Sequence, residues 1–91
     1  SERDRSMNRF KERVQNMKGG KELRSEREKL FNKVRQMEQD IATLENNIGF
    51  FSKSKNAETL IADVREKIER TKRDMADTIE KIRLIDEHET K

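Results

Sequence analysis

Residues 46–58 read NNIGFFSKSKNAE and separate two long segments in which apolar residues recur every three or four positions. The stretch contains a glycine, two of the chain's four phenylalanines and a short lysine-serine run. Small and polar residues between two periodic segments are typical of a turn. The stretch therefore predicts a connection between two helices, and the fold depends on how these helices pair.

Each flanking segment carries a stripe of inward-facing residues with heptad spacing. Within residues 30–51 and 61–85, the spacing alternates between three and four, the pattern of a coiled-coil helix. Residues 1–18 show the same spacing and are followed by Gly19-Gly20, where a glycine in the left-handed conformation can end a helix. The main stripe residues that we expect to hold the structure are Leu30, Val34, Ile41, Leu44, Ile48, Ile61, Val64, Ile68, Met75 and Ile82.

The two long stripes match each other in an antiparallel register. Facing residues then have position numbers with a nearly constant sum, and a sum of 109 places Ile48 opposite Ile61 and Leu30 opposite Ile79. We predict an all-α fold, an antiparallel coiled-coil helical hairpin with an additional short N-terminal helix. The expected segments are a basic amphipathic helix at 1–18, a Gly-Gly break at 19–20, hairpin helices at 21–51 and 57–91, and a hairpin tip at 52–56.

A bare hairpin of this composition is marginally stable, because only 30% of the residues are hydrophobic and 45% are charged. Full burial of a large apolar side chain contributes roughly 1.5–3 kcal/mol, against about 1–2 kcal/mol per residue for backbone ordering. We expect the exposed edge to be covered by the N-terminal helix, by a second copy of the chain or by further domains. A domain-swapped dimer, with residues 52–56 straightened, and a free chain that folds only with its partner are further alternatives.

The hairpin tip is the first candidate site. Phe50 lies off the stripe, whereas Phe51 continues it. Either both rings close the end of the core, or Phe50, Lys53 and Lys55 form an exposed aromatic-basic tip that contacts a partner. Such a tip suits a protein surface, a single-stranded base or a phosphate. It is a weak membrane anchor, and no apolar run is long enough to span a membrane.

The N-terminal segment is the second candidate site, because residues 1–18 carry six basic and three acidic groups. Its basic residues could contact the phosphates of RNA or DNA. These residues are Arg3, Arg5, Arg9, Lys11, Arg13 and Lys18. The competing interpretation is a solvated surface of mixed charge, since the net charge is only +3 and acidic residues interrupt most basic clusters.

The sequence shows no pattern of a catalytic, cofactor or metal site. It has no cysteine and no glycine-rich phosphate loop, and its one histidine, His88, lies near the C-terminus, where we expect a solvated side chain. We therefore expect no enzyme activity, no cofactor and no metal. The lack of cysteine and of a signal peptide favours a cytoplasmic location. Because the chain begins with Ser1, we expect a fragment or a processed form of a longer protein.

Two stretches, RSEREKL at 24–30 and LENNIGFFSKSKNAE at 44–58, carry a resemblance to a bacterial family. They are similar to the C-terminal coiled-coil region of the Bacteroidetes-type repeat proteins built from domain of unknown function three-four-nine. The resemblance runs from residue 22 onward and includes the pattern Glu-Asn-Asn-hydrophobic-Gly-Phe. The family's repeats usually contain tryptophan, which this chain lacks, so the chain would correspond to the terminal coiled coil alone. The resemblance implies a cytoplasmic helical protein with no assigned enzyme activity, and it transfers no site residues.

Together these features favour a non-enzymatic coiled-coil interaction or scaffolding module of a larger bacterial cytoplasmic protein. Its partner would be another protein, or a second copy bound through the helices. The alternative is an RNA- or DNA-binding helical module that uses residues 1–18 and the tip. The dependence of binding on salt concentration distinguishes the two functions, because nucleic-acid binding weakens as salt rises whereas apolar helix pairing persists.

Overall fold

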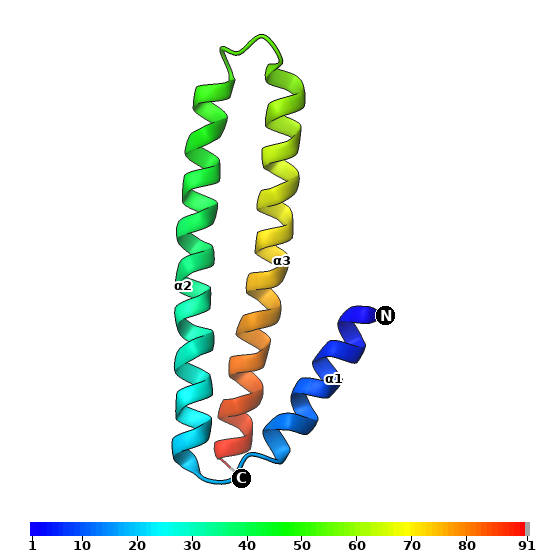
Figure 1. Cartoon of the computed structure of the whole chain (residues 1–91), viewed down its shortest axis with the longest axis vertical. Helices are drawn as coiled ribbons and strands as arrows, with labels where there is room; N and C mark the ends of the chain where they lie inside the picture. Colours follow the sequence, from blue (N-terminus) through cyan, green and yellow to red (C-terminus); the bar gives the residue numbers. More distant parts are fainter. Residues whose placement is uncertain (91) are drawn as a thin grey trace.

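The computed structural model describes residues 1–90 as three α-helices (Figure 1). Helix α1 spans Glu2–Gln15, α2 spans Gly20–Phe51 and α3 spans Ala57–Glu89. Helices α2 and α3 run antiparallel along the whole length of the molecule, and α1 lies beside the C-terminal half of α3 (Figure 1). Residues 1–90 form no strand, so the predicted all-α hairpin with a short N-terminal helix is confirmed.

The predicted stripes form the contact between the two long helices. Every stripe residue of α2 and α3 is buried or half-buried. The buried residues are Leu23, Leu30, Met37, Ile41, Ile68, Thr78, Ile82 and Ile85. The polar residue Thr78 is accommodated because its hydroxyl donates a hydrogen bond to the carbonyl oxygen of Asp74, 2.8 Å away in the preceding turn.

The predicted pairing of Leu30 with Ile79 is wrong. Ile79 is 50% exposed, and Leu30 shares its buried cluster with Ile82. The stripe of α3 passes through Thr78 and Ile82, and one further residue rotates a side chain by about 100° around an α-helix. Ile79 therefore lies on a flank of the hairpin rather than between the helices.

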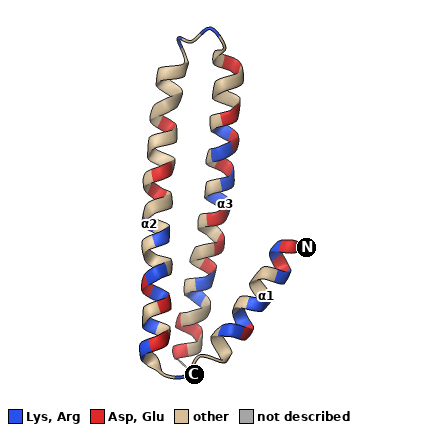
Figure 2. Cartoon of the chain, in the orientation of Figure 1, with Lys and Arg blue, Asp and Glu red and all other residues tan. Residues whose placement is uncertain are grey.

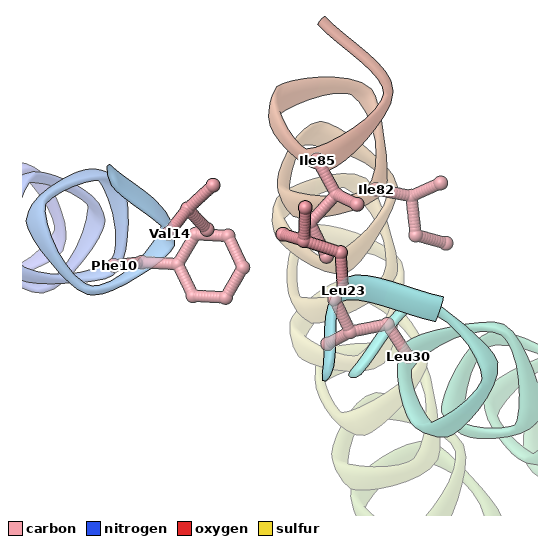
Figure 3. Packing of buried hydrophobic residues seen from close by; sticks show 6 residues of the cluster. All are labelled: Phe10, Val14, Leu23, Leu30, Ile82 and Ile85. Atoms are coloured by element: carbon pink, nitrogen blue, oxygen red, sulfur yellow. The ribbon is translucent and has the colours of Figure 1, made fainter. Parts of the chain in front are cut away.

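The largest buried cluster lies at the open end of the hairpin, where three helices meet (Figure 3). Phe10 and Val14 of α1 point toward α3 and close the cluster from one side (Figure 3). The other members are Leu23 and Leu30 of α2 and Ile82 and Ile85 of α3. Ile85 is 0% exposed, because α1 covers the side of α3 that α2 leaves open. In this structure the N-terminal helix thus covers the edge of its own hairpin.

Packing is looser toward the tip. The stripe residues nearest the tip are only half-buried, and the last buried side chains before it are Ile41 and Ile68. The half-buried residues are Leu44, Ile48, Phe51, Leu60, Ile61 and Val64. The molecule is 55 Å long, and α1 does not reach the end that carries the tip (Figure 1).

The link between α1 and α2 differs from the expected helix ending at Lys18. Helix α1 ends at Gln15, with Asn16 as its C-terminal cap. Gly19 has a φ of 93° and directly precedes the first residue of α2. The glycine conformation that we expected to end the first helix instead begins the second, because only glycine adopts this backbone geometry without strain.

Candidate functional site

The hairpin tip is a short series of turns held by local hydrogen bonds. The hydroxyl of Ser52 donates to the carbonyl oxygen of Gly49 at 2.8 Å, and the amide of Ser54 donates to the carbonyl oxygen of Phe51 at 3.0 Å. The amide of Ala57 donates to the carbonyl oxygen of Ser54 at 3.2 Å. Asn56 precedes α3 as expected, but its side chain makes no capping hydrogen bond. The tip is therefore held by hydrogen bonds from two backbone amides and from the hydroxyl of Ser52.

The two phenylalanines of the tip have different environments. Phe51 is half-buried against the hairpin, whereas Phe50 is 78% exposed. Lys53 and Lys55 are also exposed, and they are the basic residues at the turn (Figure 2). No carboxylate lies between Glu45 and Glu58 in the sequence. The tip thus presents an aromatic ring and two cations, and the carboxylate of Glu58, which lines one hollow with Lys55, lies at the start of α3.

Two of the basic residues proposed for nucleic-acid contact connect α1 to the hairpin. Arg3 forms an ion pair with Asp77 of α3. Arg13 forms an ion pair with Glu26 of α2, with Nη2 2.5 Å from Oε1. A phosphate would have to compete with these carboxylates, so both arginines are better suited to docking α1.

The other four basic residues of the N-terminal segment face solvent. Arg5 and Arg9 lie 3.6 Å and 4.0 Å from carboxylate oxygens of Glu2 in exposed pairs. Such pairs contribute little and leave the guanidinium groups accessible. Lys11 and Lys18 are exposed as well. The structure therefore does not gather the six predicted residues into one strip of free cations.

A second exposed aromatic residue, which the sequence analysis did not single out, lies on α2. Phe31 is 47% exposed, and the guanidinium carbon of Arg27 lies 5.5 Å from the centre of its ring. A shallow hollow of about 330 Å³ surrounds the ring. It is lined by Arg24, Arg27, Glu28, Phe31, Asn32 and Arg35. The available signal was an aromatic residue off the apolar stripe, within the most basic part of α2.

Arg27 is held beside Phe31 by an ion pair across the hairpin. Its Nε lies 2.7 Å and its Nη2 3.3 Å from the two carboxylate oxygens of Asp86. The hydrogen bond to Asp86, and then the charge of that carboxylate, raise the pKa of Arg27 above its usual value. The two hydrogen bonds to Asp86 orient the guanidinium beside the ring of Phe31.

The only histidine lies in a second hollow, between α1 and α3. His88 is half-buried because α3 continues through Glu89 and α1 lies against this end of the helix. The side chain expected to be solvated at this position is therefore partly shielded from solvent. The hollow, of about 250 Å³, is also lined by Lys11, Val14, Gln15, Arg83, Leu84 and Glu87. Within residues 1–90, no three histidine or acidic side chains lie close enough together to hold a metal ion.

None of the helices formed by residues 1–90 has a stretch long and apolar enough to cross a membrane. Comparisons of the chain with protein-family models, with curated proteins and with solved structures found no match. The resemblance of residues 24–30 and 44–58 to a bacterial repeat-protein family accordingly stays a prediction.

Proposed function

We propose that this chain is a non-enzymatic coiled-coil interaction module, and that it belongs to a larger bacterial cytoplasmic protein. The observation that carries the proposal is the exposure of Phe50 at the far end of the hairpin. An aromatic ring exposed to 78% loses the hydrophobic stabilisation that burial would supply, and aromatic side chains are enriched where proteins bind one another.

The surroundings of Phe50 define the kind of partner. Lys53 and Lys55 lie in the same turn, and the nearest acidic residue in the sequence is Glu58, so the turn has an excess of positive charge and an acidic surface is favoured. The ring needs an apolar recess of its own size. We therefore expect a protein partner with a small hydrophobic pocket bordered by carboxylates, and the long arms of α2 and α3 would hold the tip away from the rest of the protein.

A photo-crosslinking experiment tests the proposal in cells. Benzoylphenylalanine replaces Phe50 in one variant and Ala62, an exposed residue of α3, in the control. We expect a discrete crosslinked protein from position 50 and none from position 62. The captured protein is then purified, and its affinity for the wild-type chain is measured by titration calorimetry.

The same titration separates tip binding from unspecific attraction. Phe50→Ala and Lys53→Glu should each weaken binding by about tenfold or more, as expected for residues at the centre of an interface. Lys72→Glu reverses an exposed lysine far from the tip and should leave the affinity unchanged. Equal affinities for wild type, Phe50→Ala and Lys53→Glu would contradict the proposal.

The second candidate function is RNA or DNA binding. It is supported by the exposed guanidinium groups of Arg5 and Arg9 and by the ability of Phe50 to stack on a base. Fluorescence anisotropy with a labelled single-stranded RNA tests it. Saturable binding that falls steeply with salt and is lost in Arg5→Glu/Arg9→Glu would support this function. Saturable binding that is unaffected by salt, or no binding at low salt, would contradict it.

A further inference from the structure

A second stripe of regularly spaced residues runs along α2, outside the hairpin contact. Its spacing alternates between four and three throughout, as in a coiled-coil contact, and all its members are exposed. The stripe consists of Arg24, Glu28, Phe31, Arg35, Glu38, Ala42, Glu45 and Gly49. It contains Phe31, an exposed aromatic side chain in the first half of α2, whereas the exposed Phe50 near the other end of this helix lies outside it. We call these eight residues the outer stripe.

The outer stripe lies on the flank of the hairpin that α1 does not cover. Glu26 pairs with Arg13 of α1 on one side of the contact between α2 and α3, whereas Arg27 pairs directly with Asp86 across the other. Phe31 lies four residues after Arg27 and therefore on the same side of the helix. The outer stripe is thus accessible along the length of α2.

The charges of α2 are divided between its two halves (Figure 2). Residues 20–35 contain six basic and three acidic side chains, whereas residues 36–51 contain three acidic and no basic ones. Glu38 and Glu45 form no ion pair within the described part of the chain. Two copies of α2 that meet antiparallel would place each basic half against an acidic half.

We propose that two copies of this chain associate through the outer stripe, with the two α2 helices antiparallel about a two-fold axis. A position sum of 73 maps the stripe onto itself, as a symmetric interface requires. Phe31 of one copy then faces Ala42 of the other, and Arg35 faces Glu38. Each pair occurs twice in the dimer.

The side chains in this register are complementary in size and charge. Ala42 is small and leaves room for the ring of Phe31, and Gly49 leaves room for Arg24. Arg35 exchanges its hydrogen bond with Asn32 of its own helix for an ion pair with a carboxylate. Glu45 of the second copy faces Glu28, and Arg24, one helical turn before Glu28, flanks this acidic pair and offsets part of its charge.

Charge reversal at the axis tests the proposal by sedimentation equilibrium at low salt. The wild type should show a reversible monomer-dimer equilibrium. Arg35→Glu and Glu38→Arg each create two pairs of like charges, and each should weaken self-association by about tenfold or more. Mixing these two single variants should produce a heterodimer, because both facing pairs are then attractive. The double variant Arg35→Glu/Glu38→Arg should dimerise like the wild type.

Two phenylalanine variants complete the test. Phe31→Ala should weaken the dimer, whereas Phe50→Ala should not change it, so the dimer is tested independently of partner binding at the tip. All these residues are exposed, and circular dichroism should show unchanged helix content. A wild type that stays monomeric at its highest soluble concentration would overturn the proposal. A dimer that resists both single charge reversals, or single variants that do not combine, would overturn it as well.

Discussion

Arg13 of α1 contacts Glu26 of α2 and, at the same time, the ring of Phe10. Its guanidinium carbon lies 5.3 Å from the centre of the ring, and Nη2 lies 2.5 Å from the Glu26 carboxylate. Lys81 of α3 lies over the same ring, with Nζ 5.2 Å from its centre. Side chains of all three helices therefore meet at Phe10, which fixes α1 against its own hairpin.

This arrangement predicts that α1 packs within one chain rather than between chains. A nitroxide label at Ser6→Cys should broaden the amide resonances of Asp74 and Asp77, because these residues line one hollow with Ser6. The label should have no such effect when spin-labelled chains are mixed with separate isotope-labelled chains. Broadening at Asp74 and Asp77 in the mixture would show that α1 is exchanged between copies.

The open end of the hairpin should carry most of the stability. Ile85 is 0% exposed, so Ile85→Ala should lower the free energy of unfolding by about 2–5 kcal/mol. Ile79 is the matched control, because it is 50% exposed on the same helix, and Ile79→Ala should change the value by about 0.5 kcal/mol or less. Urea denaturation followed by circular dichroism measures both.

If Ile85→Ala does not fold, the milder variant Ile85→Val can be compared with Ile79→Ala instead. It should lower the free energy of unfolding by about 0.5–1.5 kcal/mol. Equal losses for Ile85→Ala and Ile79→Ala would show that the cluster is not packed as described.

Thr78 offers a stabilising substitution. Its side chain is buried, and its hydroxyl bonds only to the carbonyl of the preceding turn, which already accepts a helical hydrogen bond. Thr78→Val leaves no buried polar group without a partner and adds apolar surface to the helix contact. We expect thermal denaturation to show that Thr78→Val raises the free energy of unfolding by up to about 1 kcal/mol. A loss of stability in Thr78→Val would mean that the hydroxyl has a further partner.

Glu80 should make the stability of the fold depend on pH. Arg83 donates hydrogen bonds to both carboxylate oxygens of Glu80, and these bonds hold the pKa of that carboxyl below its ordinary value of 4.5. A carboxyl with a lowered pKa in the folded state stabilises the fold above pH 4.5. Its contribution is lost as the pH falls through the folded-state pKa.

Thermal melts of wild type and Glu80→Gln test this effect. The wild type should melt at the higher temperature at neutral pH, and the difference should vanish at a pH where the carboxylate is protonated. Arg83 also pairs with Glu87 at 2.8 Å, so Glu87→Gln serves as a control that leaves the Glu80 contacts in place. A difference between wild type and Glu80→Gln that does not change with pH would contradict the assignment.

The hairpin could be predicted from the sequence because its determinants are local. The heptad spacing of the two long segments and the polar stretch between them indicate two helices and a turn. Spacing did not identify the inner neighbour of Leu30, because Ile79 and Ile82 both continue an apolar pattern. Which of them is buried depends on the packing of the helices around each other, and this is a tertiary property.

The candidate sites were less predictable for the same reason. The exposure of Phe50 agrees with its position off the stripe. In contrast, nothing local shows that Arg3 and Arg13 meet Asp77 and Glu26, since these pairs form only when α1 docks. Phe31 directly follows a buried leucine. Its ring is uncovered because α1 packs on the opposite flank of the hairpin.

The concentration of buried side chains at the open end has a dynamic consequence. Local opening of a protein requires less free energy where few apolar contacts must be broken. Amide hydrogen exchange should therefore be slowest around Leu30 and Ile85, although this end of the hairpin has no covalent connection between its arms. Exchange should become faster toward Phe51 and Ile61, at the linked end. The hairpin would then open from its loop, so the surface around Phe50 could adjust its shape while the distant end stays folded.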